Sequence, residues 1–236
     1  MEESISRVLV VTAHPDDVDF GAAGTVAGWV EAGVEVSYCV VTDGDAGGDD
    51  PTVPREDMPG IRRAEQCAAA KAVGVTDVHF LGYPDGRLTV CLELRRDIAR
   101  VIRQVRPDRV VSQWPERNWE RIFASHPDHM AAGEATLCAV YPDARNPFAF
   151  PQLAAEGLEP HKVGQVWLMG APEPNVYPDI TDSIDRKVAA LRCHESQIGG
   201  FEDLPGFLRG WAELTARQGG LPEGRMAEAF RTIATA

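Results

Sequence analysis

The chain has 236 residues, of which 44% are hydrophobic and 25% charged, and its formal net charge is −13. This composition is typical of a globular protein and points to neither a disordered chain nor a membrane protein. The acidic balance argues against a nucleic-acid partner, because phosphate binding needs a basic face. An ordinary solvated surface explains the same charge. Because no linker-like stretch interrupts the chain, we expect one domain over 1–236.

The cysteines and the N-terminus indicate a cytoplasmic protein. The five cysteines are scattered, and none forms a Cys-x-x-Cys pair, so neither a disulfide framework nor a cysteine zinc ribbon is predicted. The first residues, MEESIS, lack the basic start and the long apolar core of a signal peptide. No apolar run approaches the length of a membrane span, so we expect no membrane partner.

The hydrophobic pattern predicts strands that alternate with helices. In chain order we expect a strand over 7–12, a helix over 20–31, a strand over 34–42, a helix over 61–73, a strand over 78–81 and a helix over 92–105. There follow a strand over 109–112, a helix over 127–140, a strand over 163–169 and a helix over 183–193. This alternation predicts an α/β, Rossmann-like three-layer fold with a mainly parallel sheet and helices on both faces.

Glycine, proline and aspartate mark the expected loops. The segment 43–60 is long for a loop in a compact domain, and such loops are often lids or binding loops. We also expect loops over 113–123 and 142–160. The tail has at most two amphipathic helices, around 207–216 and 223–233.

Acid/base and metal-binding side chains follow the first expected strand, which ends in the run VLVVTAHPDD. His14, Asp16, Asp17 and Asp19 come directly after the apolar residues. In open α/β sheets the ligand crevice lies just beyond the carboxyl ends of the strands. These side chains are therefore expected where chemistry is usually done, and His14 and Asp17 are close enough in sequence to reach one ion.

A second cluster, His126-Pro127-Asp128-His129, stands at another strand-to-helix transition. An isolated His-x-x-Asp match is more often a capped helix start with a surface histidine. Two such clusters in one α/β chain are a much stronger signal. A catalytic zinc site keeps three protein ligands and one position for water, so the second cluster would supply the third ligand.

The residues of the two clusters suggest chemical roles, although the sequence leaves open which aspartate and which histidine has each role. Bound zinc lowers the pKa of its water to about 7, and a nearby carboxylate can accept the proton. One of Asp16 and Asp17 would bind the metal while the other faces the water. One of His126 and His129 would be a ligand, and the other would stabilise an oxyanion or protonate the leaving group. Such a site would hydrolyse an amide or an ester.

The motifs Ala13-His14-Pro15-Asp16-Asp17 and 126–129 resemble those of the LmbE-like or PIG-L-type deacetylases. These zinc-dependent hydrolases mainly remove acetyl groups from N-acetylglucosamine-type sugars and their conjugates. The resemblance implies that His14, Asp17 and His129 hold the metal. It also implies that Asp16 is the general base, that His126 stabilises the tetrahedral intermediate and that Asp128 orients His126.

The resemblance extends from about residue 7 to 133 and, more weakly, over 182–197. It implies that Arg62 and Asp85 line the sugar site, although a surface ion pair of Arg62 with Glu65 is the ordinary alternative. The patch His194-Glu195-Ser196-Gln197 also matches, but without an assigned role. Many members have Glu directly after the paired aspartates, where this chain has Val18.

The expected substrate is a small N-acyl amino sugar or glycoside, and the expected cofactor is Zn²⁺, with Fe²⁺ or another divalent ion as an alternative. A hydratase that adds water to a double bond with the same site is a second hypothesis, since some relatives are hydratases. A catalytically silent binding protein is the third. Exposed Trp119, Phe148 or Phe150 would serve either the substrate or a neighbouring subunit of a homo-oligomer.

Overall fold

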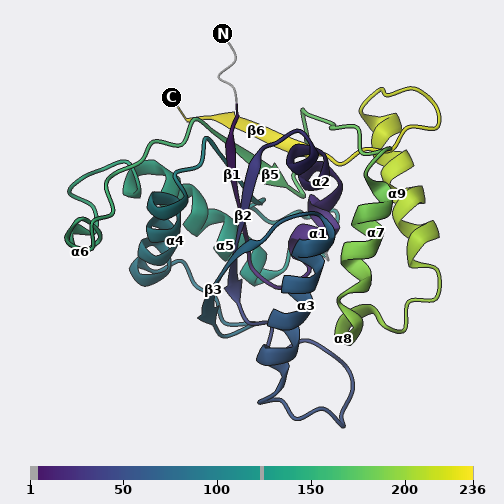
Figure 1. Ribbon diagram of the computed structural model, residues 1–236, viewed down its shortest axis with the longest axis horizontal. Helices are drawn as coiled ribbons and strands as arrows, with labels where there is room; N and C mark the ends of the chain where they lie inside the picture. The colour runs from purple at the N-terminus through teal and green to yellow at the C-terminus, as the bar shows by residue number, and fades with distance from the viewer. Residues whose placement is uncertain (1–4, 123–124, 236) are drawn as a thin grey trace.

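A six-stranded sheet forms the centre of the computed structural model, which describes residues 5–122 and 125–235 (Figure 1). The strand order is β3-β2-β1-β4-β5-β6. Strands β1 to β5 are parallel, and β6 runs antiparallel to β5. The strands are β1 (Arg7–Thr12), β2 (Glu35–Thr42), β3 (Asp77–Tyr83), β4 (Arg109–Gln113), β5 (Gln165–Met169) and β6 (Phe230–Ala234).

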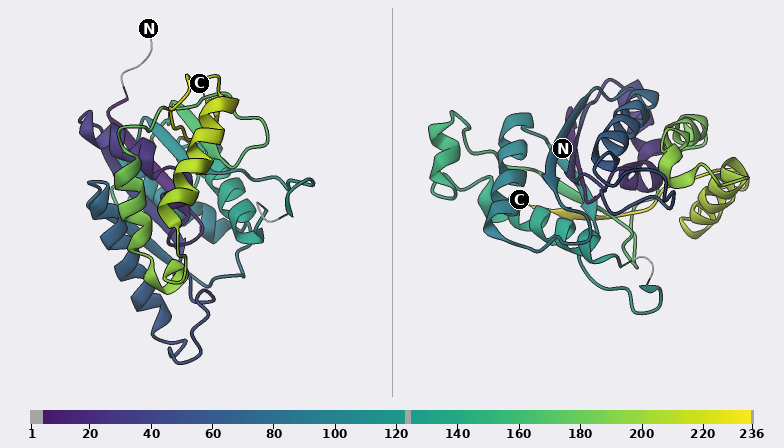
Figure 2. Two further views of the ribbon diagram at one scale, coloured as in Figure 1. Left: turned by 90° about the vertical axis from the view of Figure 1, so that its right-hand side faces the viewer. Right: turned by 90° about the horizontal axis from the view of Figure 1, so that it is seen from below.

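Helices cover both faces of this sheet, which confirms the predicted three-layer α/β fold (Figures 1 and 2). On one face lie α4 (Leu92–Val105), α5 (Pro127–Cys138), the π-helical turn η2 (Ala139–Asp143) and α6 (Pro151–Ala155). On the other lie α1 (Asp17–Gly21), α2 (Ala23–Glu31), α3 (Met58–Ala72), α7 (Ile184–Arg192) and α8 (Glu195–Ile198), with α9 (Leu204–Gln218) packed outside α7.

The strand sequences explain the two cores. In β1, Val8 and Val10 point into the core under α2 and α3, whereas Leu9 and Val11 point into the core under α4 and α5. A strand that is covered on both faces needs apolar residues at every position. This is why the first strand is a continuous apolar run.

The helix predicted over 20–31 is divided into α1 and α2, and the prediction of one continuous helix was wrong. Ala22 has φ −146° and ends the first helix. The carboxylate of Glu228 then accepts the amides of Gly24 and Thr25 at 3.1 and 2.8 Å. Lys187 pairs with the same buried carboxylate at 2.5 Å. A remote charged pair therefore caps the start of the second helix, at the point where the backbone of Ala22 interrupts the first.

The helix predicted around 223–233 was also wrong, because this segment ends in strand β6. Pro222 and Gly224 precede strand β6, and both residue types disfavour a helix. In β6 the ring of Phe230 is buried 5.2 Å from that of Trp167 on β5. The tail thus closes the open edge of β5, which would otherwise expose unpaired backbone groups. The loop predicted over 142–160 also contains α6 and the end of η2.

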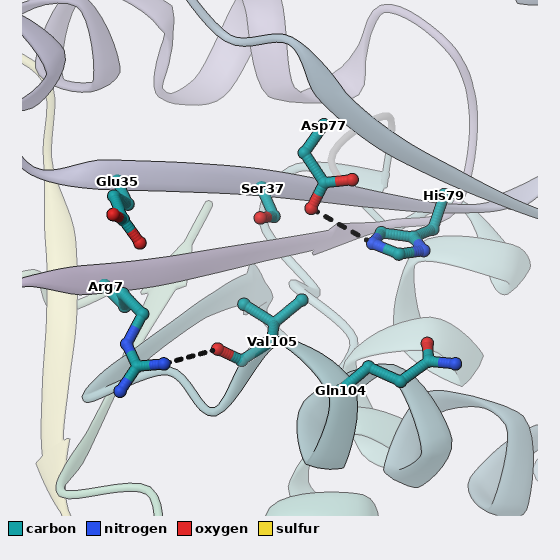
Figure 3. Close-up of a pocket in the computed structure, with 7 residues that line it drawn as sticks. All are labelled: Arg7, Glu35, Ser37, Asp77, His79, Gln104 and Val105. Atoms are coloured by element: carbon teal, nitrogen blue, oxygen red, sulfur yellow. Dashed lines mark hydrogen bonds and ion pairs between the residues drawn. The ribbon is translucent and has the colours of Figure 1, made fainter.

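The amino ends of β1 to β3 border a hollow of about 270 Å³ (Figure 3). Its lining includes Arg7, Glu35, Asp77 and His79. The imidazole of His79 is 3.2 Å from the Asp77 carboxylate, and the Asp77 side chain is exposed. The hollow lies at the amino ends of the strands, whereas both predicted histidine clusters lie at the carboxyl ends.

Helix α5 packs unusually closely on the end of β4. A Cβ atom added at Gly133 would lie 2.3 Å from the backbone oxygen of Gln113. A side chain there would push the helix away from the strand, so only glycine permits this approach. The approach matters because the same helix begins with the cluster 126–129.

We expect Gly133→Ala to lower the free energy of unfolding by about 1–3 kcal/mol, since overpacking shifts the backbone. Gly28→Ala is the matched control, because nothing lies within 4 Å of an added Cβ there. In that exposed helical position alanine should raise stability by about 0.5–1 kcal/mol. Urea denaturation measures both values, and equal effects of the two substitutions would contradict this account of the packing.

Candidate active site

The two predicted clusters meet where the topology of the sheet changes direction. Chain connections lead from β1 towards β2 and β3 on one side, and from β4 towards β5 on the other. Such a switch point leaves a crevice at the carboxyl ends of the two central strands. His14 follows β1, and His126 and His129 begin α5, the helix after β4. Residues 115 positions apart therefore face each other across this crevice.

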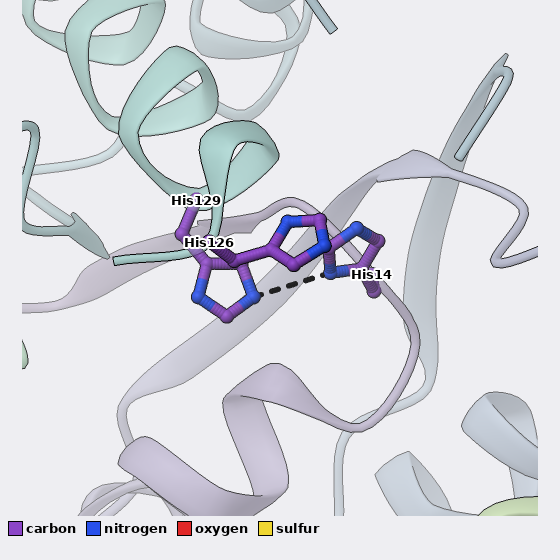
Figure 4. Close-up of side chains that lie close together, drawn as sticks. All are labelled: His14, His126 and His129. Atoms are coloured by element: carbon purple, nitrogen blue, oxygen red, sulfur yellow. Dashed lines mark hydrogen bonds between the residues drawn. The ribbon is translucent and has the colours of Figure 1, made fainter. Parts of the chain in front are cut away.

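Three imidazoles lie together in the crevice (Figure 4). His14 Nδ1 is 3.2 Å from His129 Nε2. The ring of His126 stands edge-on to that of His14, with 4.8 Å between centroids. The three histidines form one group whose ligand atoms are close enough to share an ion, and His14, Asp85 and Asp128 form another.

The two nitrogens of His14 face different carboxylates. On the Nδ1 side, Asp17 Oδ2 is 3.4 Å away, and Asp17 Oδ1 is 2.9 Å from His129 Nε2. On the Nε2 side lie Asp85 Oδ1 at 3.1 Å and Asp128 Oδ2 at 3.3 Å. One imidazole thus separates two groups of candidate ligands.

Two imidazoles and a carboxylate on the Nδ1 side form the donor set of a divalent metal site, at spacings close to those of ligands around a tetrahedral ion. Zinc bonds of about 2.0–2.2 Å place neighbouring ligand atoms about 3.3–3.6 Å apart. His14 Nδ1 and His129 Nε2 lie 3.2 Å apart, and Asp17 approaches them with different oxygens, Oδ2 at 3.4 Å from His14 and Oδ1 at 2.9 Å from His129. Imidazole and carboxylate ligands are those of catalytic zinc sites, and they also suit iron and other divalent ions. These three residues therefore fit a divalent metal.

Electrostatics makes the crevice favourable for positive charge. Burial alone would lower the pKa of His14, but the carboxylates of Asp17, Asp128 and Asp85 outweigh it and raise the pKa to about 12. The negative carboxylates favour a proton on His14, and they would favour a bound cation for the same reason. A divalent ion would take over the role of that proton.

The Asp128 carboxylate contacts His14, whereas the sequence predicted that it orients His126. It accepts the amide hydrogens of Gly86 at 2.6 Å and Leu88 at 3.2 Å, which fixes its position. Burial raises the pKa of Asp128, but the contact with His14 and these two amides outweigh it and lower the pKa. His126 instead uses Nδ1 to accept the Asp128 amide at 3.2 Å. That contact caps α5 and leaves Nε2 of His126 as the donor.

Asp16 has a backbone conformation that is rare for a residue with a side chain, with φ +91°. Its carboxylate lies 3.0 Å from Nη2 of Arg62, which also donates to the Pro15 carbonyl. Burial and the neighbouring Asp17 carboxylate raise the pKa of Asp16 to about 7, although Arg62 acts in the opposite direction. A carboxylate of this kind is matched to proton transfer near neutral pH.

The two residues expected to line a sugar site lie at this crevice, but their contacts are internal. Arg62 is buried against Asp16 and donates to the Gly44 carbonyl at 3.4 Å. Asp85 faces His14, and its amide donates to Asp45 at 2.8 Å. Substrate binding by Arg62 and Asp85 stays a prediction.

The family model of PIG-L, GlcNAc-PI de-N-acetylase, matches residues 9–140. A diacetylchitobiose deacetylase of Thermococcus kodakarensis is 34% identical over 82% of this chain and 71% of its own length. The chain belongs to the PIG-L family.

Solved structures with the same fold include two that are named for different reactions. An N,N'-diacetylchitobiose deacetylase from Pyrococcus horikoshii has a TM-score of 0.88 and 31% identity, and the match covers 98% of this chain and 85% of that one. GalB, a 4-carboxy-2-hydroxymuconate hydratase from Pseudomonas putida, has a TM-score of 0.79 at 22% identity, with 98% and 97% covered. The second likeness shows the fold alone. No helix described within 5–122 and 125–235 is long and apolar enough to cross a membrane.

The crevice of this PIG-L protein also contains residues that were not predicted from sequence. Gln113, the last residue of β4, accepts the amide of Ala13 at 2.9 Å and so ties the ends of β1 and β4 together. A polar residue at the end of an apolar strand was the available signal. Gln66 accepts the amide of Asp16 at 2.8 Å, and nothing in the amphipathic pattern of its helix distinguished it.

We expect Asp128→Asn to weaken zinc binding by about 10–100-fold, because carboxylates that orient a ligating histidine have effects of this size. Asparagine would place an amide beside Nε2 of His14 and the two backbone donors, where only an acceptor fits. Competition with a chromophoric chelator measures the affinity. The matched control is Asp143→Asn, a buried aspartate that pairs with Arg95 at 2.8 Å. If both variants bind zinc like the wild type, the orienting role is excluded.

Proposed function

We propose that this PIG-L protein is a zinc-dependent deacetylase that hydrolyses the acetamido group of an amino sugar or a sugar-containing natural product. The observation that carries the proposal is the convergence of His14, Asp17 and His129, whose polar atoms lie 2.9–3.4 Å apart, with the ring of His126 4.8 Å from that of His14. Asp16 directly precedes Asp17, and that neighbouring carboxylate helps to raise its pKa. The deacetylases at 34% and 31% identity support the reaction class. A small acylated sugar is the proposed partner; nucleic acid and membrane are not.

His14, Asp17 and His129 would hold the ion through the Nδ1 side of His14. The carboxylates on the Nε2 side support this choice, because a ligating histidine usually donates its other ring hydrogen to a carboxylate. When bound, the metal polarises the amide carbonyl and lowers the pKa of a water molecule. His14 is thereby positioned by Asp85 and Asp128.

Asp16 would accept the proton of the attacking water and later deliver it to the departing amine. The guanidinium of Arg62 holds that carboxylate in place. His126 would donate from Nε2 to the oxyanion that develops on the amide oxygen, where such donors are most effective. The products are acetate and the free amine in equal amounts.

Amine release from a panel of N-acetylated mono- and disaccharides and glycosides tests the reaction. Equal amounts of amine and acetate are expected from at least one member. A hydratase on the same fold would release neither compound, and a binding protein would bind sugars without turnover. Failure of every substrate to release acetate, with zinc bound, would contradict the proposal.

We expect His129→Ala to retain less than about a tenth of the zinc of the wild type, because it removes one of three protein ligands. A strong chelator should abolish turnover of the wild type, and added zinc should restore it. His79→Ala is the control, since His79 lies at the opposite edge of the sheet. Full zinc occupancy of the His129→Ala protein in elemental analysis would remove His129 from the ligand set.

We expect Asp16→Asn to lower kcat by about 10²–10⁴-fold while zinc stays bound, because it removes a general base and no ligand. Asp97→Asn serves as the control, since that carboxylate accepts from Tyr83 and Arg100 away from the histidines. Steady-state kinetics and zinc analysis of the same samples give both quantities. A variant at Asp16 that turns over like the wild type would show that the base lies elsewhere.

A further inference from the structure

The left-handed backbone of Asp16 must be held by its surroundings. Non-glycine residues avoid this region because Cβ crowds the following carbonyl, and exceptions persist only where other contacts enforce them. At the helix start the Asp16 carbonyl accepts the amides of Asp19 at 2.9 Å and Phe20 at 3.0 Å. Its own amide points the other way and donates to Gln66 Oε1 at 2.8 Å. Gln66 therefore holds the backbone of the proposed base.

A buried chain of hydrogen bonds orients that glutamine. The Gln66 amide nitrogen donates to Asp19 Oδ2 at 2.9 Å. Because an ionised carboxylate only accepts, this contact sets which end of the Gln66 amide faces Asp16. His194 Nε2 lies 2.8 Å from the same oxygen, although it is 175 positions away in sequence. Asp19, Gln66 and His194 are each 0% exposed.

This chain of hydrogen bonds adds little to the stability of the fold by itself. Among the described residues, Asp19 Oδ1 and His194 Nδ1 are buried without a hydrogen-bond partner. A buried polar network that is only partly satisfied costs more than an apolar core of the same volume. Such costs are typical of residues kept for function.

We infer that His194, Asp19 and Gln66 are positioning residues that hold Asp16 in its left-handed conformation and so aim its carboxylate into the crevice. The inference rests on the proposed function, in which Asp16 is the base. It gives one residue of the patch His194-Glu195-Ser196-Gln197, namely His194, a role in this hydrogen-bond network. His194 is the far end of a series of hydrogen bonds that leads through Asp19 and Gln66 to the backbone of Asp16.

The structure offers variants that separate positioning from folding. Ser196 docks the same segment independently, because Glu65 accepts both its amide and its hydroxyl at 2.7 Å. Substitution of the His194 ring should therefore leave the segment attached to α3. Ser196→Ala weakens that docking without touching the chain and is the matched control. His194→Gln keeps a donor that can reach Asp19, whereas His194→Leu removes it.

We expect kcat to fall about 10–100-fold in Gln66→Met and His194→Leu, because small displacements of a reacting group have effects of this size. KM should stay within about twofold, since substrate contacts are unchanged. His194→Gln should recover most of the loss, and Ser196→Ala should match the wild type. The double variant Gln66→Met/His194→Leu should be no slower than the slower single variant, because both act through one chain.

Crystal structures give a readout that does not depend on activity. In Gln66→Met, Asp16 is expected to leave the left-handed region, while His14 and His129 stay together. If Asp16 keeps its positive φ in both Gln66→Met and His194→Leu, the inference is overturned, as it is if kcat is unchanged. A wild type without deacetylase activity would refute the proposed function, and the backbone of Asp16 would still decide this inference. Should His194→Leu fail to fold, Gln66→Met, which conserves volume, supplies both measurements.

Discussion

The pairing of β1 with β4 is the constraint on which the site depends. These two parallel strands lie side by side from Val8 and Arg109 onward, and their carboxyl ends stop together. Gln113 then ties the two ends by accepting the amide of Ala13. Loops that leave adjacent parallel strands in opposite directions open a crevice without any special loop design. The distance of 3.2 Å between His14 and His129 is thus a consequence of sheet topology combined with the close seat of α5.

Carboxylates concentrate around His14 to an extent that would oppose folding without a compensating positive charge. Asp17, Asp85 and Asp128 all lie within 3.4 Å of its ring nitrogens. Buried like charges raise each other's free energy, and a proton on His14 or a divalent cation relieves it. The same electrostatic requirement therefore governs both the stability of the crevice and its suitability for a metal. The fold itself also offsets negative charge, because the backbone amides of Gly86 and Leu88 donate to the Asp128 carboxylate.

Sequence reasoning worked where local chemistry decides structure. The strand predicted over 7–12 and the helix predicted over 92–105 are both observed with those bounds. The motif residues could be assembled in advance because strand ends converge in this fold class. Sequence reasoning failed at Ala22, where the helix is broken and Glu228 caps the part that follows, and at the tail, where β6 pairs with the open edge of β5. In both cases the deciding partner is remote in sequence.

The C-terminal part of the chain stabilises elements that the family match over 9–140 contains. Glu228 caps α2 and pairs with Lys187 of α7, while His194 reaches Asp19 in α1. Two separate contacts thus bring the last third of the chain onto the segment that follows β1. Asp16, the proposed base, has a positive φ and needs such support, because strain at a site persists only when neighbouring structure enforces it. The arrangement therefore ties the segment that follows β1 to residues far outside the matched region.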